Sequence, residues 1–165
     1  METNAADLAR QNHWRAQRVR TTLHEANKLN AKLLKQKARE NASLTDHSLR
    51  DLARMGHPYA KRAPNPPHPP WLIHKQTGKY LAGFYSRTGR RGETWFIEFG
   101  NNAEPVAGYL EDGTTKMIAR YPVFQVLAEM RSTLQLNNRR AYQSAIGLHG
   151  AAAASRARAY LRGLQ

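Results

Sequence analysis

Residues 108–124 read GYLEDGTTKMIARYPVF and connect the strand-like part of the chain to the helix that follows it. The segment contains, in order, a short apolar run, the acidic pair Glu111 and Asp112, a glycine, a basic polar loop and Pro122. Proline is favoured in the first turn of a helix because the N–H that it lacks would have no partner there. The segment therefore predicts a strand end, a turn at Gly113 and a helix that begins at Pro122.

Strand-like residues lie on the N-terminal side of this segment. Residues 79–87 are rich in aromatic and aliphatic side chains. Residues 93–100 alternate, so that Trp95, Ile97 and Phe99 lie on one face of the predicted strand. The glycines of TGRRG (residues 88–92) suit a hairpin connection. With a short third strand at residues 106–110, the pattern predicts a small antiparallel sheet of three strands.

A helix is expected on the C-terminal side. Apolar side chains recur every three or four residues from Val123 to Leu134, which is the spacing of one helical face. Asn137 and Asn138 are expected to end this helix. A helix that covers one face of the sheet gives the predicted fold class, an α+β core.

A long basic helix is expected near the N-terminus. Residues 8–41 contain neither Gly nor Pro and are rich in Ala, Leu, Lys, Arg and Gln, which favour helix. One side of the helix carries a narrow apolar stripe, interrupted by Asn30 and made of Val19, Leu23, Ala26 and Leu33. A stripe this narrow needs a partner, which is either the body of the same domain or a neighbouring subunit.

A short helix and a proline-rich arm come next. Thr45 and Gly56 suit the two ends of a helix over residues 45–56. The stretch that follows contains six prolines, which exclude a helix or a central strand. It is interpreted as an arm that reaches across a neighbouring subunit, as a stiff surface connector, or as a ligand for an aromatic groove.

The predicted organisation therefore has four regions. They are a helical N-terminal region (1–56), a proline-rich extended arm (57–78), an α+β core (79–136) and a basic helical C-terminal tail (137–165).

The composition limits the classes of protein to which the chain can belong. Its 165 residues include 26 Lys and Arg against 12 Asp and Glu, which gives a net charge of +14, and no Cys. Such a charge attracts phosphate polymers and acidic protein surfaces alike. The missing cysteines exclude disulfides and thiolate metal sites. Because the sequence has no apolar run of about 18 residues and no apolar signal-peptide core, we expect an intracellular protein without membrane contact.

No catalytic or cofactor-binding pattern is recognisable. The spacing of His57, His68 and His74 matches no zinc site. Glu111 and Asp112 would point to opposite faces at a strand end, so they do not converge as an acid–base pair. We therefore expect no enzymatic activity, no metal and no cofactor.

Basic residues beside aromatic rings raise the hypothesis of nucleic-acid contact. Arg90 and Arg91, at the predicted hairpin tip, stand near Tyr85 and Trp95 in the sequence. Such a combination can contact phosphates and stack on bases. The simpler interpretation places the rings in the sheet core and the arginines in solvent. The candidate DNA contacts are Arg15, Arg18, Lys28, Lys32, Lys35, Arg90 and Arg91.

The closing segment resembles that of the head–tail joining (tail-completion) proteins of tailed bacteriophages. The pattern of that family runs Leu-Glu-x-Gly-Thr-x-x-Met-x-Ala-Arg-Pro-Phe, and this chain carries Leu110, Glu111, Gly113, Thr114, Met117, Ala119, Arg120 and Pro122. The GHPYA and TGKYLAGF stretches upstream (56–60 and 77–84) also resemble the family, in the same order along the chain. One departure is Tyr121, which stands between the arginine and the proline that the family joins directly.

The resemblance implies a virion structural protein of the phage neck, assembled in the host cytoplasm. Such a subunit forms a homo-oligomeric ring between portal-side and tail-side proteins and surrounds the DNA passage. The alternative for Glu111 and Gly113 is a plain strand end and turn within one subunit, and the alternative function is that of a basic nucleic-acid-binding protein in the host cell. The expected subunit-interface residues are Trp71, Leu110, Glu111, Asp112, Gly113, Thr114, Lys116, Met117, Arg120, Tyr121 and Pro122.

Overall fold

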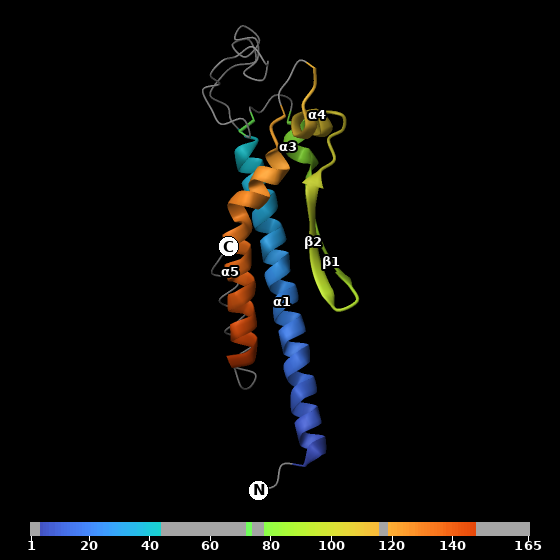
Figure 1. Cartoon of the computed structure of the whole chain (residues 1–165), viewed down its shortest axis with the longest axis vertical. Helices are drawn as coiled ribbons and strands as arrows, with labels where there is room; N and C mark the ends of the chain where they lie inside the picture. The colour runs from blue at the N-terminus through green and yellow to red at the C-terminus, as the bar shows by residue number, and fades with distance from the viewer. Residues whose placement is uncertain (1–3, 44–71, 74–77, 116–118, 148–165) are drawn as a thin grey trace. The chain divides into compact units, whose positions relative to one another are not determined.

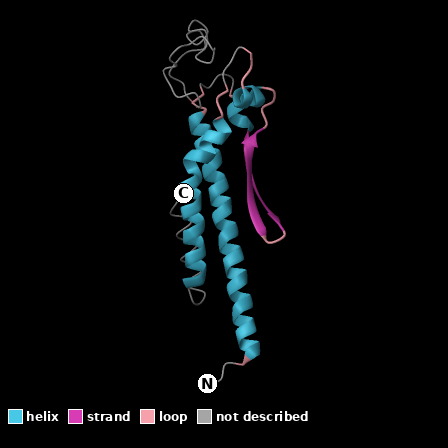
Figure 2. Cartoon of the chain, in the orientation of Figure 1, coloured by secondary structure: helices cyan, strands magenta, loops and turns pink. Residues whose placement is uncertain are grey.

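The computed structural model describes residues 4–43, 72–73, 78–115 and 119–147. In chain order these residues form helix α1 (Ala5–Asn41), helix α3 (Lys79–Gly83), strand β1 (Phe84–Arg91), strand β2 (Thr94–Asn101), helix α4 (Val106–Asp112) and helix α5 (Pro122–Gly147) (Figure 1). The two strands pair as one antiparallel hairpin (Figure 2). The prediction of a mixed fold with a long N-terminal helix, an antiparallel sheet and a C-terminal helix is confirmed.

The chain divides into two compact units, and α1, the hairpin and α5 each contribute to both. The described part of the first unit comprises residues 4–30, 88–96 and 132–147. The described part of the second unit comprises residues 31–43, 72–73, 78–87, 97–115 and 119–131.

In the first unit, α1 contacts the tip of the hairpin. The His24 ring lies 4.5 Å from the Trp95 ring, centroid to centroid, and Arg20 forms a 2.9 Å ion pair with Glu93 at the turn. Trp95 belongs to the alternating side of β2 that is less exposed, as the sequence predicts. These contacts hold α1 against the tip of the hairpin within the same unit.

Asn30 joins α1 to α5 in the first unit. It is fully buried, accepts a 2.9 Å hydrogen bond from Asn137 and donates a 3.0 Å bond to Asn138. Buried amides are tolerated because they satisfy one another. The prediction that Asn137 and Asn138 end the helix is therefore wrong: their side chains pair across to α1, and α5 continues through them to Gly147.

In the second unit, the core gathers around Phe84 and the apolar side of α1. Phe84, Leu34 and Val126 are almost fully buried, and the Tyr80 and Phe99 rings lie 5.0 Å and 6.3 Å from the Phe84 ring. The start of α5 contacts the end of α1, where Glu129 accepts from Asn41 and pairs with Lys37, both at 3.5 Å. In each unit α5 thus packs on α1. The prediction that this helix covers one face of the sheet is not met by these contacts.

Two predicted strand segments are partly or wholly helical. Residues 79–83 form α3, because Tyr80 and Phe84, four positions apart, place their rings together in an edge-on contact. Residues 106–112 form α4, whose buried side chains, Ala107 and Leu110, are three positions apart on one helical face. A short apolar run cannot be assigned to strand or helix from its periodicity alone, so the predicted third strand is wrong.

The hairpin turn is tighter than predicted. Residues 88–91 continue β1, and the turn consists of Gly92 and Glu93. Gly92 has a φ of 59°, which a glycine adopts without a steric cost. Gly89, in contrast, lies within the strand, where an added Cβ would collide with the Phe96 ring.

Several predictions concern residues outside the described ranges. These are the helix over 45–56, all but three residues of the proline-rich arm (57–78), and the tail beyond Gly147. Within the described ranges, no helix combines the length and the apolar character that crossing a membrane requires.

Candidate functional site

The segment that resembles the phage family folds as a corner between α4 and α5, here called the α4–α5 corner (residues 104–115 and 119–124). The amide of Gly113 donates to the Tyr109 carbonyl at 3.0 Å and ends α4, and the amide of Arg120 donates to the Leu110 carbonyl at 2.8 Å. Gly113 has φ 78° and ψ −175°, a region that is essentially restricted to glycine. The predicted glycine turn is therefore confirmed, although it follows a helix and not a strand.

Glu111 holds the corner together from its other side. Its Oε1 accepts a 2.6 Å hydrogen bond from the amide of Val123, one of the free N–H groups in the first turn of α5. A carboxylate in this place satisfies the amide and interacts favourably with the helix dipole. Glu111 thus acts as a capping group supplied by a neighbouring helix.

The environment of Glu111 changes its acidity. Burial raises the pKa of this carboxyl, the hydrogen bond from Val123 lowers it, and the neighbouring Asp112 carboxylate raises it, with a net shift upward. The Tyr80 hydroxyl is also buried and has no hydrogen-bond partner among the described residues. Burial, together with the negative charge of Glu111, raises the pKa of Tyr80 as well.

Arg120 is buried in the corner. Only 2% of it is exposed, and its Nη1 donates to the Leu72 carbonyl at 3.3 Å. Five donors make Arg suited to fixing several chain segments at once. Here it links the corner to residue 72, which follows the predicted anchor Trp71 in the sequence.

Tyr121, the residue by which this chain departs from the family pattern, has an unusual backbone. Among the described residues it is the non-glycine with a positive φ, at 52°. A residue before proline normally adopts an extended conformation. The left-handed conformation lets one additional residue fit between buried Arg120 and buried Pro122, and it leaves the ring 56% exposed.

Other large apolar side chains of the second unit are also exposed. Phe124 is 67% exposed and Tyr109 is 50% exposed, and Val106, Tyr121 and Leu127 are exposed as well. Val106 and Tyr109 are three positions apart on α4, and Phe124 and Leu127 are three positions apart on α5, so each pair shares a side of its helix. Tyr121 directly precedes α5. We name these five residues the aromatic rim of the corner.

The predicted interface residues divide into two groups. Leu110, Arg120 and Pro122 are buried, and Glu111, Gly113 and Thr114 are partly buried, so all six belong to the frame of the corner. Asp112 and Tyr121 are exposed. Trp71, Lys116 and Met117 lie outside the described residues.

Four members of the aromatic rim were missed in the sequence: Val106, Tyr109, Phe124 and Leu127. Phe124 is the last residue of the quoted segment, and its three-residue spacing from Leu127 in the predicted helix is the signal that could have identified it. For Val106 and Tyr109 the incorrect strand assignment concealed the shared helical side.

The candidate DNA-contact residues differ in whether they already have an interaction partner within the chain. Lys28 pairs with Glu25 at 2.9 Å, and Arg90 pairs with Glu93 at 2.7 Å while its guanidinium lies over the Trp95 ring. Arg91 lies over Phe96, and Arg18 also has an interaction partner. Arg15, Lys32 and Lys35 form no ion pair with any residue that the structure describes.

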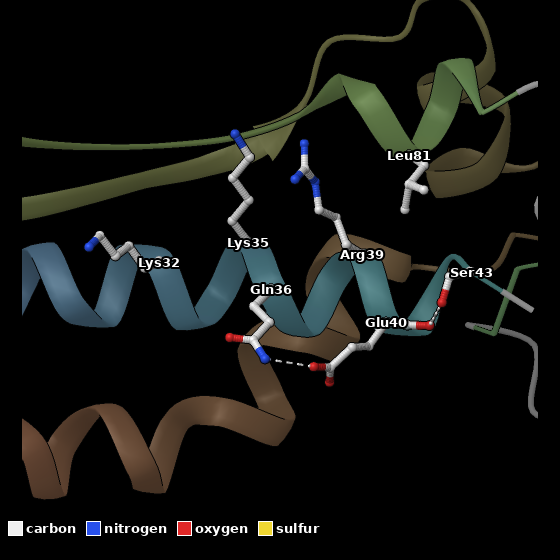
Figure 3. Close-up of a pocket in the computed structure, with 7 residues that line it drawn as sticks. All are labelled: Lys32, Lys35, Gln36, Arg39, Glu40, Ser43 and Leu81. Atoms are coloured by element: carbon white, nitrogen blue, oxygen red, sulfur yellow. Dashed lines mark hydrogen bonds between the residues drawn. The ribbon is translucent and has the colours of Figure 1, made fainter. Parts of the chain in front are cut away.

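A basic depression lies beside the end of α1, within the second unit (Figure 3). It is open, has a volume of about 410 Å³ and is lined by Lys32, Lys35, Gln36, Arg39, Glu40, Ser43 and Leu81. Arg39 is not among the residues predicted from the sequence to contact DNA, and it follows Lys32 and Lys35 at helical spacing. No group of three or more His, Asp and Glu side chains with metal-binding proximity occurs among the described residues.

Comparison with known protein families, proteins and structures identified no similar protein. No protein-family model matches the chain, and no curated protein or solved structure matches it either.

Proposed function

We propose that this chain is a structural subunit of the neck of a tailed bacteriophage, which forms a ring between head and tail and surrounds the DNA passage. The sequence support is the resemblance of residues 110–122 to the closing segment of head–tail joining proteins. On this proposal the chain has a mechanical function and no catalytic one.

One observation supports this proposal most strongly: the residues that match the pattern form a rigid frame next to exposed aromatic side chains. Leu110, Glu111 and Arg120 are hydrogen-bonded within the corner, whereas Tyr121 and Phe124 are largely exposed. Exposed apolar groups of this size are typical of protein–protein contact sites. A frame that fixes their positions before assembly lowers the entropic cost of binding.

In a ring, each subunit contacts two neighbours through two different surfaces. Ring contacts are heterologous, so one patch on a subunit meets a different patch on the next. The aromatic rim supplies the apolar anchors that the centre of an interface needs, and Asp112 supplies an exposed charge at its edge. The proline-rich arm (57–78) and the basic face of α1 are the segments that we expect to contact neighbours or the passage.

The oligomeric state of the purified chain tests this proposal. We expect sedimentation and negative-stain microscopy to detect a closed ring, and the double variant Tyr121→Ala/Phe124→Ala to remain monomeric at the same concentration. Tyr142→Ala is the control, because Tyr142 is also an exposed aromatic residue of α5 but belongs to the other unit. A folded wild-type monomer at all concentrations, or equal disruption by both sets of variants, would count against the proposal.

The second candidate function is a basic nucleic-acid-binding protein that acts in the host cell. The observation that favours it is the group Lys32, Lys35 and Arg39 on α1, which form no ion pair with a residue that the structure describes. DNA binding by a monomer with no assembly, and with no association with virions, would favour this alternative.

A further inference from the structure

Two sets of cations on α1 differ in their ion pairing. Arg10, Arg20, Lys28 and Lys37 each form an ion pair with a carboxylate. Lys32, Lys35 and Arg39, which line the basic depression, form no ion pair with a described residue. The acidic side chains among the described residues thus pair with the first set of cations and not with the second.

Glu40 is the one acidic residue among the described residues that line the depression, and its carboxylate accepts a 2.9 Å hydrogen bond from the Gln36 amide. In Figure 3 this pair projects from α1 on the side opposite to Lys35 and Arg39. Three cations against one carboxylate leave the described lining with a net positive charge.

We propose that Lys32, Lys35 and Arg39 form a binding site for the phosphate backbone of double-stranded DNA. The three residues follow one another at steps of three and four, so they share a side of α1 and extend over about 10 Å of its axis. One DNA strand presents a phosphate about every 3.4 Å along the duplex axis. The row of cations thus spans about three phosphates. Because it contacts the phosphates and not the bases, its binding does not depend on the DNA sequence.

The composition of the depression favours DNA over an acidic protein surface. Two of the three cations are lysines, which are depleted in protein–protein interfaces. The depression is open, and among the described residues that line it Leu81 is the one apolar residue and none is aromatic, so no described ring is placed for an unpaired base to stack on. The carbon surface of its wall comes largely from the aliphatic stems of the long polar side chains. The inference holds whether or not the chain forms a ring, because it concerns one face of one helix.

The test is fluorescence anisotropy of the full chain with a 20-base-pair duplex of mixed sequence, at salt concentrations from 50 to 200 mM. Each phosphate contact contributes about 0.9 to the slope of log K against log salt. We expect the variant Lys32→Gln/Lys35→Gln/Arg39→Gln to lower that slope by about 2.7, which means that the wild type loses about 40-fold more affinity over this salt range.

The matched control is Arg10→Gln/Arg20→Gln/Lys28→Gln. It removes the same charge from the same helix, but each of its residues is paired. We expect a slope change below about 1. An equal slope change in both triple variants would overturn the site, since it would show an effect of net charge only, and so would unchanged binding by the first variant.

Two further measurements make the outcome decisive. Circular dichroism and sedimentation at each salt concentration separate loss of binding from loss of folding or of assembly, so failure of this site and failure of the ring proposal are distinguishable. Poly-glutamate at equal charge concentration is the competitor. Displacement of the duplex by poly-glutamate as readily as by unlabelled DNA would overturn the DNA assignment in favour of an acidic protein partner.

Discussion

The amide of Val123 donates a 2.6 Å hydrogen bond to Oε1 of Glu111, so the end of α4 caps the beginning of α5. Residues 113–115 and 119–121 are the described part of the connection between the two helices. The same loop is closed by the bond from the Arg120 amide to the Leu110 carbonyl. Two hydrogen bonds between neighbouring elements thus convert a mainly polar loop into a defined corner.

Replacement of Glu111 should measure the strength of this cap. Glu111→Ala removes the acceptor and should lower the free energy of unfolding by about 1 kcal/mol, within the 0.5–2 kcal/mol range of capping groups. Glu111→Gln keeps an oxygen that can accept from Val123 and should cost less. Urea denaturation at constant pH gives both values, and equal losses for the two variants would contradict the capping role.

Glu111 should also make stability depend on pH. Its pKa is raised in the folded state, so the folded chain binds this proton more strongly than the unfolded chain. The stabilisation from this group is full below the unfolded value of about 4.5 and is lost as the pH rises through the folded pKa. Glu111→Gln removes the effect. The wild type should therefore lose stability relative to Glu111→Gln as the pH rises above about 4.5, and a difference that grows in the opposite direction would refute the raised pKa.

Tyr121 offers a comparison of two substitutions that both remove its ring. Positive φ is costly for alanine and free of cost for glycine, so Tyr121→Gly should be more stable than Tyr121→Ala by about 1 kcal/mol. Thermal and urea unfolding test the order. Both variants should impair assembly equally if the exposed ring is the anchor, so a variant pair that differs in assembly but not in stability would contradict this account.

Two glycines of α4 should respond in opposite directions to alanine. Gly108 lies within the helix, and the nearest atom to an added Cβ is 3.5 Å away, so Gly108→Ala should stabilise the chain by about 0.5–1 kcal/mol. Gly113 has a backbone that is essentially restricted to glycine, and Gly113→Ala should destabilise by about 1–3 kcal/mol. Unfolding curves of the two variants, recorded under identical conditions, compare them directly. Similar effects of the two changes would mean that the corner can relax its backbone.

The buried amides of the first unit predict a non-additive pair of mutations. Asn30→Leu leaves the Asn137 amide without its acceptor in a buried site and should cost about 1–3 kcal/mol. Asn30→Leu/Asn137→Leu replaces both partners by apolar groups and should recover much of that loss. A double-mutant cycle by urea denaturation measures the coupling. Additive losses would show that the two amides do not depend on each other.

The sequence predicted long regular elements better than short ones. The absence of glycine and proline over residues 8–41 was sufficient to predict α1, and the alternation around Trp95 was sufficient to predict β2. Residues 106–110 were misassigned because five residues fit strand and helix equally well, and the burial that selects α4 depends on distant partners. Asn137 was interpreted as a helix end because its partner, Asn30, is more than one hundred positions away.

The corner shows the same distinction between local and distant information. Gly113 and Pro122 could be placed from local chemistry, since each has a backbone preference that suits one position. The role of Glu111 as a cap of α5 depends on a residue twelve positions further along the chain and could not be inferred from a strand model. The left-handed Tyr121 had no signal beyond its departure from the family pattern.

Immunogold electron microscopy of tailed phage particles whose genome encodes this chain tests the central claim most directly. The antibody is raised against the purified chain, and particles that lack the gene product serve as the control. The account predicts gold at the junction of head and tail in intact particles. Label over the capsid or along the tail, or particles without label while infected cells contain abundant protein, would contradict the proposal that this chain is a neck subunit.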